Sequence, residues 1–197
     1  MNLPNKLTIG RIILVPFFVA AMLIDFPLHT LAAIIIFAVA SITDMLDGKI
    51  ARKRGIVTDF GKFADPLADK ILVLAALLCF VQMGLCSCVP VIIVLFREFC
   101  VTSIRLIAAS HGKVVAANIW GKAKTVSQII AIIAILFMQL SLSFTGIGLV
   151  EMSPDIYNSL ELVFGIIGNV LVWISSVFAI ISGVIYIYQN KQFIKDM

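Results

Sequence analysis

The sequence predicts an all-α integral membrane protein, a bundle of six transmembrane helices, and three observations support this fold class. Of the 197 residues, 61% are hydrophobic and only 13% are charged, whereas about a quarter of the residues in soluble domains are charged. Because a spanning helix needs roughly 20 apolar residues, this composition allows at most about six spans. The apolar residues also form long runs rather than the alternating segments of a membrane barrel.

Six apolar stretches are the predicted helices. They lie at residues 7–24, 31–43, 67–83, 89–109, 126–142 and 163–188. Lys6 and Arg11 come before the apolar run of the first stretch, which superficially resembles a signal peptide. The run continues to about Ile24 without a convincing cleavage site, so we expect a retained span. No internal repeat, low-complexity tract or linker divides the chain, and residues 1–197 are therefore predicted to form a single transmembrane catalytic domain.

Two of these elements need separate justification. The stretch at 31–43 is too short to cross about 30 Å of hydrocarbon. It crosses only if its helix continues through Asp44 and Asp47 toward Arg52, which places two carboxylates at the end of a membrane helix. The fifth connection, residues 143–162, is expected to be long enough to carry an interfacial segment.

Lys and Arg residues indicate the orientation of the bundle. With six spans, both termini share one side with the second and fourth connections. These segments hold Lys6, Arg11, Lys49, Arg52, Lys53, Arg54, Lys62, Lys113, Lys122, Lys124, Lys191 and Lys195. The first, third and fifth connections contain no Lys or Arg. By the positive-inside rule, we expect a multi-pass protein of the cell membrane with both termini in the cytoplasm.

Four aspartates are the candidate metal ligands. Asp44 and Asp47 are three residues apart and Asp65 and Asp69 are four apart, so each pair shares one face of its helix. A short loop joins the two helices, which lets four carboxylates converge near the membrane, where each costs about 2.5–3.5 kcal/mol on insertion scales. Two Mg²⁺ or Mn²⁺ ions about 3.5–4 Å apart would compensate this charge and favour phosphoryl chemistry.

Small residues and an arginine accompany the first aspartate pair. Gly48 and Ala51 lie on the same predicted helix and would let a base or a phosphate approach the backbone. Arg52 offers a planar fork for phosphate oxygens. The alternative is that the aspartates are ordinary solvent-exposed residues of a cytoplasmic loop at the end of a helix. Two pairs at helical spacing, together with the small residues and the arginine, favour the site.

The spacing Asp-x2-Asp-Gly-x2-Ala-Arg-x8-Gly-x3-Asp-x3-Asp, from Asp44 to Asp69, resembles the signature of the CDP-alcohol phosphotransferase family. Six helices with cytoplasmic termini are also the architecture of that family. The resemblance implies that the four aspartates bind two metals, that Asp69 is the general base, and that the protein is a homodimer. It further implies a site for CDP-diacylglycerol formed by Asp44, Gly48, Ala51, Arg52 and Gly61.

Basic residues outside the signature indicate the acceptor. Arg97 and Glu98 lie inside the fourth stretch, and ionisable residues within a membrane are functional candidates. Arg105 follows on the same helix, and Lys122 and Lys124 begin the fifth. Positive-inside anchoring is the alternative for the two lysines, and a structural ion pair with Glu98 is the alternative for Arg97. Together the four cations predict a pocket for a dianion, which a phosphorylated acceptor explains and free serine or choline does not.

Three segments resemble the branch of the family that uses glycerol 3-phosphate, namely residues 2–11, 97–105 and 121–125. The resemblance assigns the phosphate of the acceptor to Arg11, Arg97, Arg105, Lys122 and Lys124. It also places Asn5 and Thr8 near the phosphates of CDP-diacylglycerol.

The resemblance implies that the chain joins CDP-diacylglycerol and sn-glycerol 3-phosphate to give phosphatidylglycerol phosphate and CMP in phospholipid biosynthesis. Mg²⁺ and Mn²⁺ are equally suited to the aspartates. Membrane lipids are expected partners and nucleic acid is not. One alternative is a transferase for another acceptor, such as inositol phosphate or phosphatidylglycerol. A cation transporter is less consistent with the sequence, because the carboxylates cluster at one end and no repeat is visible.

Overall fold

The computed structural model describes residues 3–54, 59–110, 119–146 and 148–190. Within these ranges the chain forms six α-helices and no strand, which confirms the predicted all-α class. The helices are α1 (Leu3–Leu23), α2 (His29–Arg54), α3 (Asp59–Gln82), α4 (Cys88–Ser110), α5 (Ile119–Gly146) and α6 (Pro154–Gln189).

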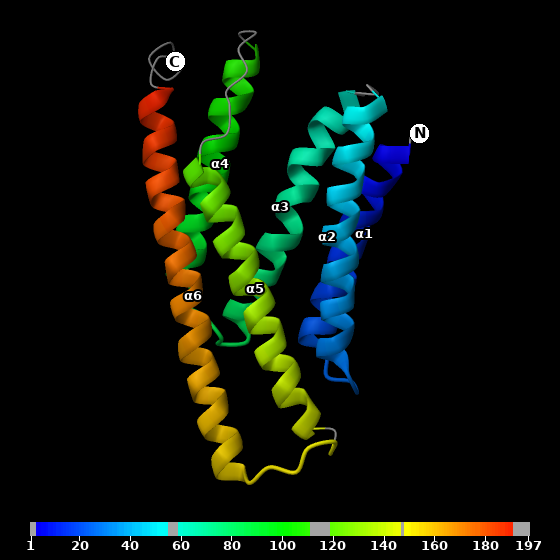
Figure 1. Ribbon diagram of the computed structural model, residues 1–197, viewed down its shortest axis with the longest axis vertical. Helices are drawn as coiled ribbons and strands as arrows, with labels where there is room; N and C mark the ends of the chain where they lie inside the picture. The colour runs from blue at the N-terminus through cyan, green and yellow to red at the C-terminus, as the bar shows by residue number, and fades with distance from the viewer. Residues whose placement is uncertain (1–2, 55–58, 111–118, 147, 191–197) are drawn as a thin grey trace.

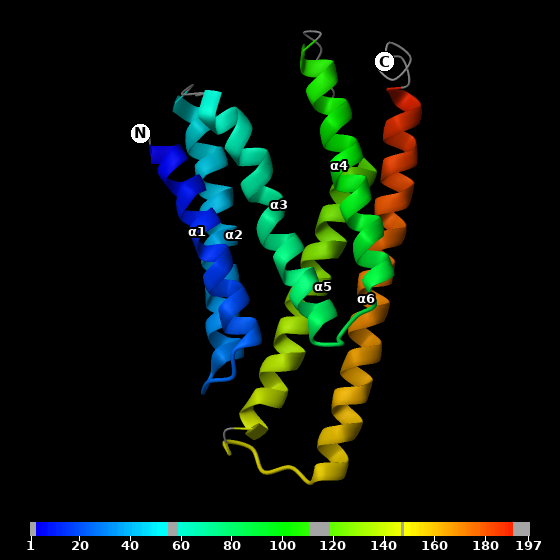
Figure 2. The same ribbon diagram turned by 180° about the vertical axis from the view of Figure 1, so that it is seen from behind.

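The helices are arranged in two groups of three (Figures 1 and 2). In one group α1 packs against α2 and α3, and in the other α6 packs against α4 and α5. Contacts of α3 with α4 and α5, and of α2 with α5, join the two groups. Successive helices run in opposite directions, so α2, α4 and α6 end where α1, α3 and α5 begin, at the upper end in Figure 1.

The boundaries of two helices bear directly on the sequence predictions. Helix α2 runs from His29 to Arg54 without interruption, which confirms that the short apolar stretch continues through Asp44 and Asp47. The expectation of a long fifth connection over 143–162 is wrong, because α5 extends to Gly146 and α6 begins at Pro154. Proline suits the first turn of a helix, and the polar residues that follow it continue the helix although they do not continue the apolar run.

Many apolar side chains lie on the surface of the bundle, and several polar side chains are buried inside it. Phe96, Phe99 and Leu106 on α4 expose 70%, 62% and 63% of their surface. Arg11 and Gln128, in contrast, are each 2% exposed. Two segments, Ile119–Thr145 and Pro154–Gln189, are long and apolar enough to cross a membrane. The 36 residues of α6 would measure about 54 Å, which exceeds a hydrocarbon core of about 30 Å.

The apolar core lies mainly within the first group of helices and along its contact with α5. Phe18 on α1 and Phe37 on α2 are buried with their ring centroids 5.9 Å apart. On the other side α6 approaches α5 closely at Gly168, where a Cβ atom would lie 3.2 Å from Cγ1 of Ile135. This packing leaves the space between the two groups for polar side chains.

Candidate active site

A cavity of about 750 Å³ lies between the two groups of helices, and all six helices contribute to its lining. Helix α1 contributes Arg11, α2 contributes Ser41 and its neighbours, and α6 contributes Tyr186. The larger share comes from α3, α4 and α5. Because no single helix forms the wall, residues far apart in the sequence can contact one bound molecule.

Cations dominate this lining. Five of the lining cations are the residues that the sequence assigned to the phosphate of an acceptor: Arg11, Arg97, Arg105, Lys122 and Lys124. The sixth is Lys70 of α3. Glu98 is the one acid among the lining residues of the described structure. Among the described lining residues, six cations against one acid make this part of the cavity positive, which favours a multiply charged anion.

Glu98 connects three of these cations. Its Oε1 atom accepts hydrogen bonds from Nζ of Lys124 at 2.6 Å and from Nη1 of Arg97 at 2.8 Å. Its Oε2 atom lies 3.9 Å from Nζ of Lys70. Glu98 and Lys124 are 9% and 4% exposed, so their ion pair is largely shielded from water. The structural ion pair and the cavity position of Arg97, which the sequence left as alternatives, therefore both occur.

Two further hydrogen bonds fix the cations to neighbouring helices. Nη2 of Arg97 donates to the hydroxyl of Ser182 on α6. Nζ of Lys70 donates to the hydroxyl of Thr102 on α4, which in turn donates to the carbonyl oxygen of Glu98 at 2.6 Å. The network thus joins α3, α4, α5 and α6 around one side of the cavity.

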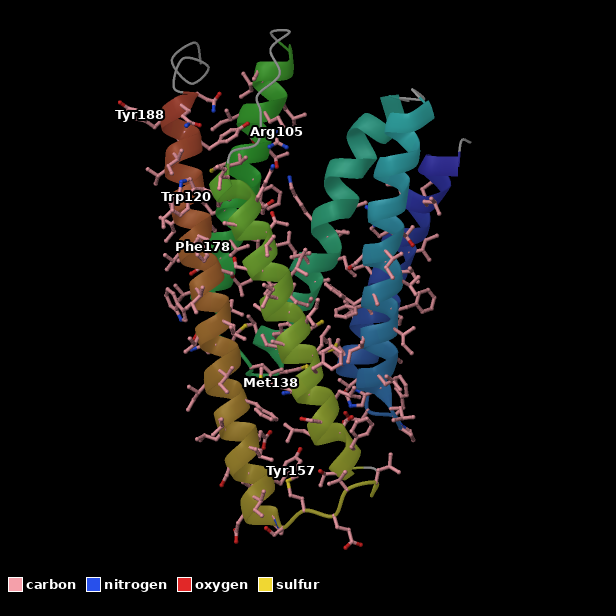
Figure 3. All side chains as sticks on the ribbon, viewed as in Figure 1. Arg105, Trp120, Met138, Tyr157, Phe178 and Tyr188 are labelled. Carbon is pink, nitrogen blue, oxygen red and sulfur yellow. The ribbon has the colours of Figure 1, made fainter. Side chains whose placement is uncertain are left out.

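Arg105 and Lys122 differ from the cations of the network because both are exposed. Neither side chain has a hydrogen bond or ion pair with another side chain that the structure describes. Arg105 lies toward the upper end of α4 (Figure 3), two turns beyond Arg97 on the same helix. An anion arriving from that end would meet these two charges first.

Several buried polar atoms of the lining have no hydrogen-bond partner within the described part of the chain. Three of them are Nε of Arg97, Nε2 of Gln128 and Oη of Tyr186. Sequence reasoning assigned no role to Gln128, Tyr186, Thr102 or Lys70. Lys70 follows Asp69 directly, and Gln128 lies one turn after Lys124 in an apolar stretch. These positions in the sequence could have identified Lys70 and Gln128 as candidate site residues.

The aspartates are placed only through the backbone. Asp44 and Asp47 belong to α2, and Asp65 and Asp69 belong to α3. Their side chains lie outside the described part of the structure, as do the side chains of Asn5, Ala51 and Arg52 and the surroundings of Gly48 and Gly61. Among the side chains that the structure describes, no group of three or more metal-binding residues is found.

The backbone nevertheless brings the aspartate segments to the cavity. Ser41, which lines it, lies one turn before Asp44 on α2. Ala68 and Lys70, which also line it, flank Asp69 on α3. Thr8 is 1% exposed and lies one turn before Arg11 on α1, beside the cavity lining rather than in it.

Comparisons with known proteins place the chain in a family. Residues 1–181 match the family model described as CDP-alcohol phosphatidyltransferase. The CDP-diacylglycerol–glycerol-3-phosphate 3-phosphatidyltransferase of Bacillus subtilis is 41% identical over 206 aligned residues, covering 98% of this chain and 97% of its own. The protein of the same name from Rickettsia bellii is 34% identical, with 98% and 97% covered. A probable phosphatidylglycerophosphate synthase from Mycobacterium tuberculosis is 40% identical over 134 residues, with 66% and 64% covered.

Proposed function

The chain belongs to the CDP-alcohol phosphatidyltransferase family, and from this premise we propose that it is a phosphatidylglycerophosphate synthase. It transfers the phosphatidyl group of CDP-diacylglycerol to sn-glycerol 3-phosphate, forming phosphatidylglycerol phosphate and CMP in phospholipid biosynthesis. The observation that carries this proposal is the set of six cations that line one cavity beside the aspartate segments. Relatives that align over nearly the whole chain bear the name of this activity.

The charge of the cavity supports a phosphorylated acceptor. Free serine has no net charge and choline is a cation, so neither would benefit from the six cations and one acid among the described lining residues. A phosphate dianion, in contrast, would be attracted by these cations. Arginine binds phosphate through two parallel hydrogen bonds and lysine binds it as a point charge. In this proposal Arg105 and Lys122 capture the acceptor, and Arg97, Lys124 and Arg11 hold its phosphate deeper in the cavity.

The aspartates supply the chemistry at the other substrate. Asp44, Asp47, Asp65 and Asp69 would hold two divalent cations, which would neutralise charge on the pyrophosphate of CDP-diacylglycerol. Asp69 accepts the proton from the terminal hydroxyl of glycerol 3-phosphate. The resulting alkoxide forms a bond to the phosphorus that carries diacylglycerol, and the bond from that phosphorus to CMP breaks.

The first part of the chain also binds CDP-diacylglycerol in this proposal. Arg52 stabilises the new charge on the departing CMP. Gly48, Ala51 and Gly61 line the nucleotide site, and Asn5 and Thr8 lie near its phosphates. The position of Ser41 and Ala68 in the cavity lining supports this arrangement, since both are neighbours of the aspartates along their helices.

We further propose that the chain is a single domain with six membrane spans, with both termini and the active site on the cytoplasmic side of the cell membrane. The antiparallel order of the helices supports an even number of spans. The exposed apolar side chains of α4, α5 and α6 support contact with lipid, because soluble monomers rarely expose such extensive apolar surface. A homodimer is the proposed assembly.

The role of Asp69 gives the direct test. The purified chain should release CMP from CDP-diacylglycerol when glycerol 3-phosphate is added. The release should stop when EDTA removes divalent cations and should resume when Mg²⁺ or Mn²⁺ is added. Asp69→Asn should reduce turnover at least about 10³-fold while CDP-diacylglycerol still binds. Asp155→Asn, which alters an exposed acid in the first turn of α6, is the control. Normal turnover by Asp69→Asn would remove this residue from the role of base.

A further inference from the structure

Tyr186 has features that the network of ion pairs does not explain. It is the residue of α6 that lines the cavity, and only 3% of its surface is exposed. Its hydroxyl is buried and has no hydrogen-bond partner among the residues that the structure describes. A buried hydroxyl without a partner costs free energy, because it has lost its hydrogen bonds to water and gained none in return.

The packing of the ring does not require the hydroxyl. Tyr186 forms a small apolar cluster with Val101 and Ile104 of α4. Phenylalanine would fill this cluster equally well and would avoid the cost of a buried hydroxyl. Buried serines of α6 differ in this respect, because their hydroxyls have partners. Ser175, for example, donates a hydrogen bond to the carbonyl oxygen of Val172 at 2.8 Å.

Tyr186 lies between two arginines that line the same cavity. Ser182, one turn earlier on α6, accepts a hydrogen bond from Arg97. Val101, which packs against Tyr186, lies one turn after Arg97 and one turn before Arg105 on α4. Tyr186 thus packs against α4 at Val101, midway along that helix between the positions of Arg97 and Arg105.

We propose that the hydroxyl of Tyr186 donates a hydrogen bond to a phosphate oxygen of the acceptor and so helps to select phosphorylated acceptors. This inference rests on the proposed function. The surrounding cations attract any dianion, but a neutral donor on the facing helix fixes the orientation of the phosphate through one directional bond. The bound phosphate supplies the partner that the hydroxyl lacks among the described residues.

Tyr186→Phe tests this contact, because it removes one oxygen atom and leaves the ring. Tyr188→Phe is the matched control on the same helix, since Tyr188 is 72% exposed and lies away from the other helices in Figure 3. In Tyr186→Phe we expect KM for glycerol 3-phosphate to rise about 5- to 30-fold, with kcat and KM for CDP-diacylglycerol unchanged within about twofold. An unchanged KM for the acceptor would overturn the proposal, as would an equal rise in Tyr188→Phe.

A second acceptor identifies the atom that Tyr186 contacts. 3-Hydroxypropyl phosphate lacks the secondary hydroxyl of glycerol 3-phosphate but keeps its phosphate. If the contact is to phosphate, the ratio of KM values between Tyr186→Phe and the unaltered chain is the same for both acceptors. If the ratio falls to one with 3-hydroxypropyl phosphate, the contact is to the hydroxyl and the proposal is wrong.

Binding of inorganic phosphate separates this inference from the proposed function. Titration calorimetry on the unaltered chain should detect binding that weakens severalfold in Tyr186→Phe and not in Tyr188→Phe. If the unaltered chain releases no CMP but shows this pattern, the proposed function fails and the phosphate contact stands. If CMP is released normally and Tyr186→Phe binds phosphate as well as the unaltered chain, only the contact fails.

Discussion

The Glu98 carboxylate lies 2.6 Å from Nζ of Lys124, so a carboxylate occupies part of a cavity that otherwise favours anions. The same oxygen accepts a hydrogen bond from Arg97, on its own helix, and the second oxygen faces Lys70 on α3. Without a carboxylate, three cations from three helices would repel one another across a space with little water. Glu98 thus keeps the cations close together and leaves a positive balance for the substrate.

Replacing this carboxylate should therefore destabilise the bundle. Glu98→Gln keeps the size of the side chain but removes the negative charge that pairs with Arg97 and Lys124. Removing one partner of a buried ion pair costs about 3–5 kcal/mol, so the thermal unfolding midpoint in detergent should fall by several degrees. Glu161→Gln, at an exposed position of α6, should leave the midpoint within about one degree. Equal midpoints for the two variants would mean that the pair contributes nothing to stability.

Arg105 should control capture of the acceptor. Hydrogen bonds to charged groups contribute about 1.5–3 kcal/mol, which corresponds to roughly a 10- to 150-fold change in affinity. Arg105→Ala should raise KM for glycerol 3-phosphate within this range and leave KM for CDP-diacylglycerol unchanged. Arg105→Lys should recover only part of the loss, because lysine lacks the planar fork. Ser103→Ala, at an exposed position of the same helix, is the control, and a rise in both KM values would argue against a specific role.

Gly183 provides space for Arg97 where α6 crosses α4. A Cβ atom at this position would lie 3.2 Å from Cγ of Arg97, a tighter contact than most packed Cβ atoms make, so the arginine side chain would have to shift. Gly183→Ala should push Arg97 from its place beside Ser182 and raise KM for the acceptor severalfold. Gly165→Ala on the same helix has nothing within 4 Å of the new atom. It should preserve activity and stabilise α6 by up to about 1 kcal/mol, and a similar loss in both variants would exclude the steric explanation.

Cysteine labelling should report the orientation of the connection between α3 and α4. Cys88 is exposed at the start of α4, whereas Cys86 is buried and its burial raises the pKa of its thiol to about 11. In right-side-out vesicles at pH 7, a maleimide that cannot cross membranes should modify Cys88 and spare Cys86, of which about one thiol in ten thousand is ionised. Modification of Cys86 should accelerate about tenfold per pH unit as the thiolate forms.

The vesicles also provide the control for this experiment. Inside-out vesicles should show slow modification of Cys88, because the reagent then meets the opposite side of the membrane. Peptide mass mapping distinguishes the two cysteines. Faster labelling of Cys88 in inside-out vesicles would reverse the proposed orientation.

Sequence predicted the positions of the helices well because lipid-facing and buried positions are both apolar. The continuation of α2 past Asp47 toward Arg52 was predicted because a helix of 13 apolar residues could not cross the membrane alone, and the helix in fact ends at Arg54. The start of α6 was not predicted. Hydropathy located the apolar run from Val163, whereas backbone hydrogen bonds and Pro154 determine where the helix begins.

The cations of the site could be predicted because a charged residue within an apolar stretch is unusual, as Arg97 is. The sequence could not determine which helices would meet around Glu98, because its contacts with Lys70 and Lys124 span 28 and 26 residues. Tyr186 was missed for a different reason. A tyrosine near the end of a membrane helix is typical of the membrane interface. Tyr186 differs from Tyr188 in its burial and in a buried hydroxyl that has no hydrogen-bond partner in the described part of the chain.

An acceptor panel tests the central claim most directly. The purified chain would be given CDP-diacylglycerol, a divalent cation and one acceptor at a time: glycerol 3-phosphate, inositol phosphate, phosphatidylglycerol, serine or glycerol. Release of CMP and the identity of the lipid product would be measured. We predict that glycerol 3-phosphate gives phosphatidylglycerol phosphate at a rate at least tenfold above every other acceptor. Turnover with inositol phosphate, phosphatidylglycerol or an uncharged alcohol, and none with glycerol 3-phosphate, would contradict the assignment.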